Sequence, residues 1–241
     1  MHALSAADLL LVWERGRTQG PLDQAIEILA VASPDRTRED LFDLTIGQRD
    51  AALLALRSAT FGPRMCGVLV CPHCGARLEL SILVSDLSVE TADEPLEEIA
   101  CEAAGYALRL RPPSTADIAA SLQAPPEQRG NSLFRRCLLS ATHGGNPVEE
   151  LPNEVIDEVA KRICEADPQV DVQLRLACSS CRHEWGVVFD IVSFFWNEIE
   201  SWVSRLLGEV HALASVYGWS EKEILSLSPV RRQFYLEATR A

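Results

Sequence analysis

The chain has 241 residues, of which 47% are hydrophobic and 24% are charged, so it can build a real core and is too apolar for disorder. The net charge of −13 and the pI of about 4.8 disfavour nucleic-acid binding, which needs a basic surface, and docking on anionic membranes. No secretory signal is evident, and the most apolar segment, 187–196, is too short to span a bilayer. We therefore expect a cytoplasmic protein that binds proteins rather than nucleic acid, membranes or a small-molecule substrate.

Residues 1–62 are expected to form an N-terminal helical region. Ser5 and Thr45 precede apolar runs with helical spacing, where serine and threonine are favoured as N-caps. Pro21 stands where a second run begins, and proline is favoured in the first turn of a helix. The pattern predicts three helices that begin at these residues and a helical region that stops before Pro63.

Two later segments change from helical to strand-like periodicity. Residues 63–87 and 169–191 each carry β-forming residues on both sides of a Cys-x-x-Cys turn. From Val170 to Leu176 apolar and polar residues alternate, which is typical of a half-buried strand. We therefore expect two β-hairpins, each with a Cys-x-x-Cys pair at its tip.

The segment between the hairpins, residues 88–168, is predicted to be a mostly helical insert. One strand is expected at 106–111, and helices are expected after Ser114, around 132–141 and at 153–166. Because the entropic cost of closing a loop grows only logarithmically with its length, such an insert still allows the two hairpins to meet.

Residues 192–241 are expected to form a C-terminal helical region. Apolar residues step by three and four along 195–217, which predicts a long amphipathic helix that ends at Gly218. Ser220 and Ser228 are expected to cap two shorter helices after it.

Four of the eight cysteines form the two Cys-x-x-Cys pairs. In a reducing compartment such pairs favour metal binding over disulfides, because a tight turn directs both sulfurs at one ion. We predict one structural Zn2+ per chain, with Cys71, Cys74, Cys178 and Cys181 as its ligands. A closed four-thiolate site has no open position for substrate, so its role is structural rather than catalytic. A redox-active dithiol and a site that has lost its metal are the alternatives.

Other residues with reactive or polar side chains receive simpler interpretations. His73 and His183 adjoin the pairs, and either is an alternative ligand, although four cysteines already complete the site. His211 is interpreted as packed or hydrogen-bonded on its helix. The isolated cysteines are interpreted as buried small hydrophobes, namely Cys66, Cys101, Cys137 and Cys164. The glutamates of the long helix are interpreted as a solvated face, namely Glu198, Glu200 and Glu209. No catalytic motif is present, so we do not expect an enzyme.

Aromatic and arginine side chains gather in the C-terminal third of the chain. Such residues dominate the energetics of protein interfaces, so we expect some of them to bind a partner and the others to pack in the core. The predicted partner-binding residues are Tyr217, Trp219, Arg231, Arg232 and Tyr235.

The C-terminal region contains a set of short motifs at 196–198, 209–211, 217–219, 223–225, 231–232 and 235–236. They resemble the T4-type baseplate protein family, which includes baseplate hub assembly chaperones of contractile phages and related injection systems. The stretches IGQRDAALLALRSATFGPR and CPHCGARLE are similar to zinc-carrying members from bacterial contractile injection clusters. The similarity covers roughly the first ninety and the last seventy residues, and the insert shows none. The resemblance implies a role in baseplate or hub assembly.

Together these observations predict an α+β protein in which a split zinc ribbon carries the insert and is flanked by helical segments. Its predicted function is non-enzymatic: it binds Zn2+ and contacts baseplate or hub subunits, either as a transient chaperone or as part of the finished particle. The alternative is a zinc-ribbon adaptor in transcription or RNA handling, which a basic, aromatic face on the ribbon would favour.

Overall fold

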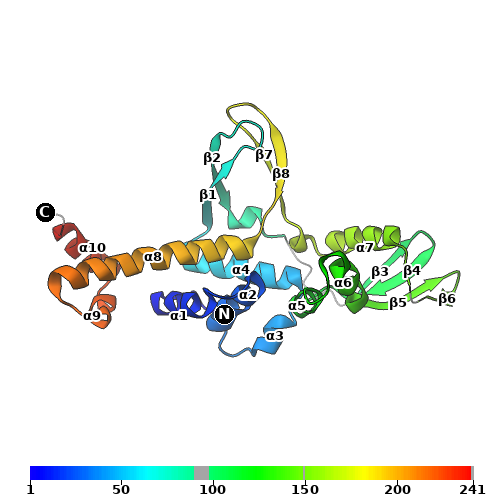
Figure 1. Ribbon diagram of the computed structural model, residues 1–241, viewed down its shortest axis with the longest axis horizontal. Coiled ribbons are helices and arrows are strands. Elements are labelled where there is room, and N and C mark those ends of the chain that lie inside the picture. The colour runs from blue at the N-terminus through cyan, green and yellow to red at the C-terminus, as the bar shows by residue number, and fades with distance from the viewer. Residues whose placement is uncertain (90–97, 149, 240–241) are drawn as a thin grey trace.

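The computed structural model describes residues 1–89, 98–148 and 150–239. It contains a helical body, two β-hairpins that project from this body, and an insert of helices and strands at one end (Figure 1). This mixed content agrees with the predicted α+β class. Residues 90–97 and 149 of the predicted insert and residues 240–241 of the C-terminal region lie outside the described residues. No described helix is both long and apolar enough to cross a membrane.

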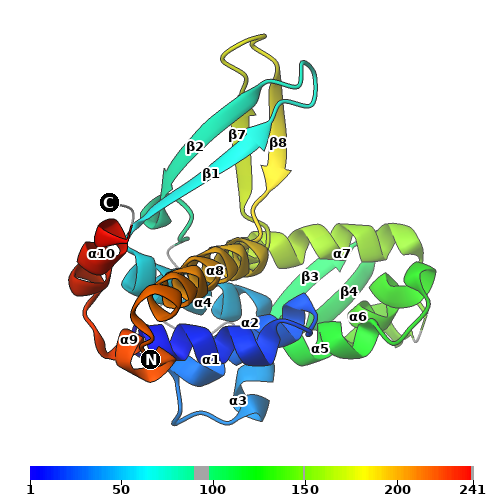
Figure 2. The same cartoon turned by 60° about the vertical axis from the view of Figure 1, so that its left-hand side comes forward.

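Helices from both ends of the chain build the body. They are α1 (Ala6–Gly16), α2 (Pro21–Ala32), α3 (Arg38–Phe42), α4 (Ile46–Phe61) and α8 (Ile191–Tyr217). Helix α8 packs against α1, α2 and α4 (Figures 1 and 2). The side chains of Leu54, Phe195 and Ile199 are fully buried between these helices, so residues far apart in the sequence share one core.

Side-chain caps determine where the helices of the body begin. The hydroxyls of Ser5 and Thr45 each accept a hydrogen bond from the backbone N–H three residues further on, which confirms the predicted starts of α1 and α4. Pro21 is the first residue of α2, as predicted. The short helix α3, which Thr37 caps in the same way, was not among the predicted elements.

The two predicted hairpins are present as separate two-stranded antiparallel sheets. Strand β1 (Arg64–Val70) pairs with β2 (Arg77–Leu83), and β7 (Gln173–Ala177) pairs with β8 (Glu184–Val188). Within the described residues, no strand of one hairpin pairs with a strand of the other. Figures 1 and 2 both show the hairpins side by side, with their turns meeting at the end away from the body.

The insert contains a sheet that the sequence analysis mostly missed. Its four-stranded antiparallel sheet has the order β3 (Ile99–Ala103), β4 (Tyr106–Leu110), β5 (Leu138–His143) and β6 (Asn146–Pro147). Its helices are α5 (Thr115–Ser121), α6 (Arg129–Cys137) and α7 (Asn153–Ala166). Among the described residues, the short 3-10 helices are η1 (Val84–Asp86), η2 (Pro126–Gln128) and η3 (Pro168–Val170).

One helix expected in the insert needs correction, and the insert has more strands than the single one predicted. The helix predicted over 132–141 ends at Cys137, and the chain continues as strand β5, which pairs with β4. This pairing and the facing helices bury a core that is separate from that of the body, namely Ala103, Leu108, Leu110, Phe134, Ala141, Val155 and Val159. Burial against the sheet thus decides the structure of a segment whose local pattern also fits a helix.

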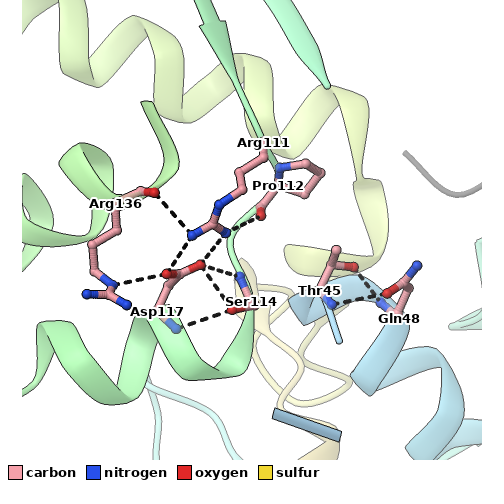
Figure 3. A network of polar contacts seen from close by, with 7 residues as sticks. All are labelled: Thr45, Gln48, Arg111, Pro112, Ser114, Asp117 and Arg136. Atoms are coloured by element: carbon pink, nitrogen blue, oxygen red, sulfur yellow. Dashed lines mark hydrogen bonds and ion pairs between the residues drawn. The ribbon is translucent and has the colours of Figure 1, made fainter. Parts of the chain in front are cut away.

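A short backbone bridge joins the insert to the body. Thr45 and Ser114 pair as an isolated antiparallel bridge. The N–H of Ile46 donates to the carbonyl of Pro113 at 3.0 Å, and the N–H of Thr115 donates to the carbonyl of Leu44 at 3.1 Å. The caps of α4 and α5 therefore lie next to each other, as Figure 3 shows.

A buried carboxylate organises the start of α5. The side chain of Asp117 is 2% exposed and accepts hydrogen bonds from Arg111 at 2.5 and 2.8 Å. It also accepts from Arg136 and from the backbone N–H of Ser114, both at 3.0 Å (Figure 3). Burial acts to raise the pKa of Asp117, but the hydrogen bonds from Arg111 and Ser114 outweigh it and hold this pKa well below its ordinary value.

The far end of α8 extends past α1, and α9 (Glu221–Ser226) and α10 (Pro229–Ala238) follow it (Figure 1). Gly218 ends α8 in a left-handed conformation with a φ of +69°, as predicted. Ser220 and Ser228 cap α9 and α10, also as predicted. We call α9, α10 and the end of α8 from residue 202 the C-terminal arm.

Candidate metal centre

The four cysteines predicted as ligands come together at the tips of the hairpins. Their sulfur atoms all lie within 4.8 Å of one another. Two sulfur–sulfur distances of 3.7 Å cross between the hairpins, from Cys71 to Cys181 and from Cys74 to Cys178. A tetrahedral ion with Zn–S bonds of about 2.3 Å separates its sulfurs by about 3.8 Å, whereas a disulfide bond is about 2.0 Å long. The spacing therefore fits a shared metal ion.

The two cysteine turns have the same backbone hydrogen bonds. In the first turn, Cys71 donates its N–H to the carbonyl five residues further on, and Gly75 donates back to the carbonyl of Cys71, both at 2.9 Å. In the second turn, Cys178 and Arg182 make the corresponding two bonds at 2.8 Å. Two matched turns that face each other can thus present four sulfurs to one ion.

Each turn needs a left-handed backbone at the residue after its second cysteine. Gly75 has a φ of +73° and Arg182 has a φ of +60°. Glycine adopts this conformation without a steric penalty, whereas for other residues it costs about 1–2 kcal/mol. A glycine after the second cysteine is the sequence signal for this conformation, as at Gly75, whereas the arginine at the matched position carries no such signal.

The surroundings of Cys178 favour the thiolate, which is the form that binds metals, whereas hydrogen bonds with the other three cysteine sulfurs raise the pKa of Cys181. The backbone N–H groups of Cys181 and Ser180 donate to the sulfur of Cys178 and lower its pKa to about 6, and the bond from Cys181 has the larger effect. Cys71 and Cys178 are buried. The donor set therefore fits a soft divalent ion such as Zn2+.

The two neighbouring histidines lie outside the cluster of ligand atoms. Among the described residues, the group that can hold a metal consists of the four cysteines alone. The rings of His73 and His183 stack on each other at 5.3 Å between centroids, and His183 also stacks on Trp185 at 6.0 Å. The histidines therefore stack on each other and are not part of the group of four sulfurs.

The isolated cysteines differ in their exposure. Cys137 is buried, and burial raises the pKa of its thiol to about 11. Cys101 and Cys164 are half-buried. The interpretation of Cys66 as buried is wrong, because strand alternation points Met65 into the core and Cys66 outward from β1.

Three of the predicted partner-binding residues form one aromatic cluster on the C-terminal arm. Trp219 stacks on Tyr217 with 4.7 Å between ring centroids and meets Tyr235 edge-on at 5.0 Å. Tyr217 is 37% exposed, whereas Trp219 and Tyr235 are half-buried. These rings therefore hold α10 against the end of α8 and leave only part of their surface to a partner.

The two predicted arginines have different environments. Arg231 is exposed, but Arg232 is 6% exposed and donates to Glu209 at 3.2 Å and to the carbonyl of Leu227 at 2.9 Å. Arg232 thus stabilises the fold, which corrects its prediction as a partner-binding residue.

The glutamates of α8 were interpreted as one solvated face, but they have different environments. Glu200 is exposed, but Glu209 pairs with Arg232, and Glu198 accepts hydrogen bonds from Arg57 at 2.5 and 2.7 Å. His211 is exposed rather than packed. Partners distant in the sequence decide these environments, so the helical pattern alone did not reveal them.

The chain is thus an α+β protein whose two hairpins share a four-cysteine cluster. Residues 5–196 match the family described as T4 bacteriophage base plate protein. This span is most of the chain, so the protein belongs to that family. No curated protein and no solved structure gave a significant match.

The match differs in extent from the resemblance that the sequence motifs indicated. It includes the insert, in which the motifs showed no similarity, and both cysteine pairs. It ends at Trp196, so the Tyr217-Gly218-Trp219 motif lies outside the matched residues. Family membership therefore rests on the body, the hairpins and the insert rather than on the C-terminal arm.

Proposed function

We propose that this chain is a non-enzymatic, zinc-stabilised protein that takes part in assembling the baseplate or hub of a contractile phage tail or related injection system. The family match over both cysteine pairs carries this proposal. Membership of a baseplate family implies interaction with other phage baseplate proteins. The finer assignment, as an assembly chaperone or hub component, is part of the proposal.

The metal completes a split zinc ribbon in this proposal. Cys71, Cys74, Cys178 and Cys181 hold one Zn2+, which bonds to all four sulfurs and leaves no open position for a substrate. Isolated two-stranded hairpins are marginally stable, and these two share no strand pairing. The ion therefore links two halves of the chain that the insert separates, and this structural role supports a non-enzymatic function.

Exposed aromatic and basic residues of the C-terminal arm are the proposed contacts to baseplate subunits. Tyr217 and Arg231 are exposed, and the neighbouring rings of Trp219 and Tyr235 hold this region rigid. Rigid aromatic anchors lose little conformational entropy on binding, which suits them as interface residues.

Affinity capture from cells that express the surrounding gene cluster tests the proposal. We expect the tagged wild type and a Cys66→Ser control to capture tail baseplate subunits, because Cys66 is exposed and lies outside the cysteine cluster. We expect a Cys71→Ser/Cys178→Ser variant to capture less, because its hairpins are no longer linked. Capture of RNA polymerase or RNA without any tail protein would instead support the adaptor alternative.

A further inference from the structure

Two large apolar side chains of α10 are strongly exposed. Val230 is 80% exposed and Phe234 is 67% exposed. They are four residues apart, so they lie on the same face of the helix. The opposite face of α10 already packs on α8 through Arg232 and Tyr235, so this exposed face is not needed for the fold of the arm.

A groove of about 650 Å³ lies beside these two side chains, between α8 and α10. Trp202 and Leu206 line it from α8, and Pro229, Val230 and Phe234 line it from α10. The apolar side chains that project and the groove that can receive such side chains therefore lie on one face of the arm.

The same groove carries charges of both signs. Arg205 lines it from α8 and Glu237 lines it from α10, and both are exposed. Within the part of the chain that the structure describes, neither residue forms an ion pair, and Glu237 accepts a hydrogen bond from Gln233 at 3.0 Å. A two-fold interface must be self-complementary, and a surface that carries apolar projections, a groove and both charges can meet this requirement.

The face is also held in one shape. Arg232 and Glu209 form a pair at 3.2 Å beneath it, and the rings of Tyr217, Trp219 and Tyr235 fix α10 to the end of α8. A surface with little freedom to lose binds at a smaller entropic cost.

We propose that this face binds the same face of a second copy of the chain. In the two-fold dimer, Phe234 of each copy enters the groove of the other, and Arg205 of each copy pairs with Glu237 of the other. This inference concerns self-association and does not depend on the proposed role in baseplate assembly.

Sedimentation velocity across a range of concentrations tests the apolar part of the interface. We expect the zinc-loaded wild type to dimerise and Phe234→Glu to raise the dimer dissociation constant by at least about a hundredfold, because the substitution occurs twice in the interface. Leu139→Glu is the matched control, because Leu139 is 54% exposed on β5 in the insert and should leave the dimer unchanged. Circular dichroism establishes that both variants are folded.

Charge reversal tests the two-fold arrangement itself. Arg205→Glu and Glu237→Arg should each weaken self-association, because each places like charges opposite one another twice. A mixture of the two variants should form heterodimers, since both cross-copy contacts then join opposite charges. A wild type that stays monomeric at every accessible concentration overturns the proposal, and so do charge variants that dimerise normally alone or fail to associate when mixed. If the wild type is monomeric and captures a baseplate subunit that Phe234→Glu does not capture, the groove binds that subunit instead of a second copy.

Discussion

Arg182 has a left-handed backbone conformation, and the residue at the matched position of the other cysteine turn is a glycine. The two turns make the same hydrogen bonds, with Gly75 at a φ of +73° and Arg182 at a φ of +60°. The two turns therefore share these hydrogen bonds but have different residues at the left-handed position, where glycine is favoured.

We predict that Arg182→Gly stabilises the zinc-loaded protein by about 0.5–1 kcal/mol, because relief of backbone strain exceeds the added entropy of the unfolded chain. The reciprocal change, Gly75→Ala, should destabilise it by about 1–2 kcal/mol. Urea unfolding at equal zinc content measures both. A lower stability for Arg182→Gly would show that the arginine side chain makes a favourable contribution at this turn.

Arg57 illustrates a second effect at the residue scale, the dependence of an ion pair on burial. Its side chain is 3% exposed, pairs with Glu198 and donates to the carbonyls of Gly62 and Arg64 at 2.7 and 2.9 Å. It thereby joins the end of α4, the start of β1 and α8.

We predict that Arg57→Ala costs about 3–5 kcal/mol, because it leaves a partly buried carboxylate and two carbonyls without their donor. Arg109→Ala is the matched control: Arg109 also donates twice to a glutamate, Glu98, but is 62% exposed, so its loss should lower the stability far less than the loss of Arg57. Chemical denaturation of both variants measures the difference. Equal costs would contradict the importance of burial here.

At the scale of elements, the two hairpins depend on a link that strand pairing does not supply. Their bases pack on the body through residues such as Met65 and Leu174, but the hairpins form separate sheets. The four sulfurs are what come together at the tips.

We predict about one Zn2+ per purified chain, and a lower melting temperature with faster proteolysis of the hairpins after strong chelation. Cys71→Ser/Cys178→Ser should lose the metal, whereas Cys66→Ser should retain it. Elemental analysis and thermal melts of the three proteins provide the measurement. An unchanged melt after verified zinc removal would mean that packing alone holds the hairpins.

At the scale of the whole molecule, the chain leaves the body for the first hairpin, passes through the insert, and returns through the second hairpin to α8. The insert therefore needs its own attachment to the body, which the bridge between Thr45 and Ser114 provides. Asp117 stabilises this attachment by accepting hydrogen bonds from Ser114, Arg111 and Arg136 (Figure 3).

We predict that Asp117→Asn costs at least about 2 kcal/mol at neutral pH, because a charged acceptor of several hydrogen bonds is lost. The pKa of Asp117 is lower in the folded than in the unfolded state, so its contribution is fully present above the ordinary aspartate pKa. The contribution falls as the pH drops from there toward the folded-state pKa. The difference in unfolding free energy between wild type and variant should therefore be smaller at pH 3 than at pH 7. An equal difference at the two pH values would contradict this account.

Local patterns in the sequence determined the features that depend on neighbouring residues. Ser5, Thr45 and Gly218 begin or end helices where predicted, because caps act within one turn. Each cysteine pair lies at the tip of its hairpin for the same reason, since alternation and a tight turn are local properties.

Tertiary structure alone decided the features that depend on contacts between distant residues. The segment after Cys137 became a strand because β4 was available to pair with it, and Arg232 was buried because Glu209 on another helix faces it. The gathering of four sulfurs was predictable because a metal site needs all its ligands, whereas the exposure of Phe234 was not. Spacing along one helix shows which residues share a face, but only the packing of the other helices determines whether that face is covered.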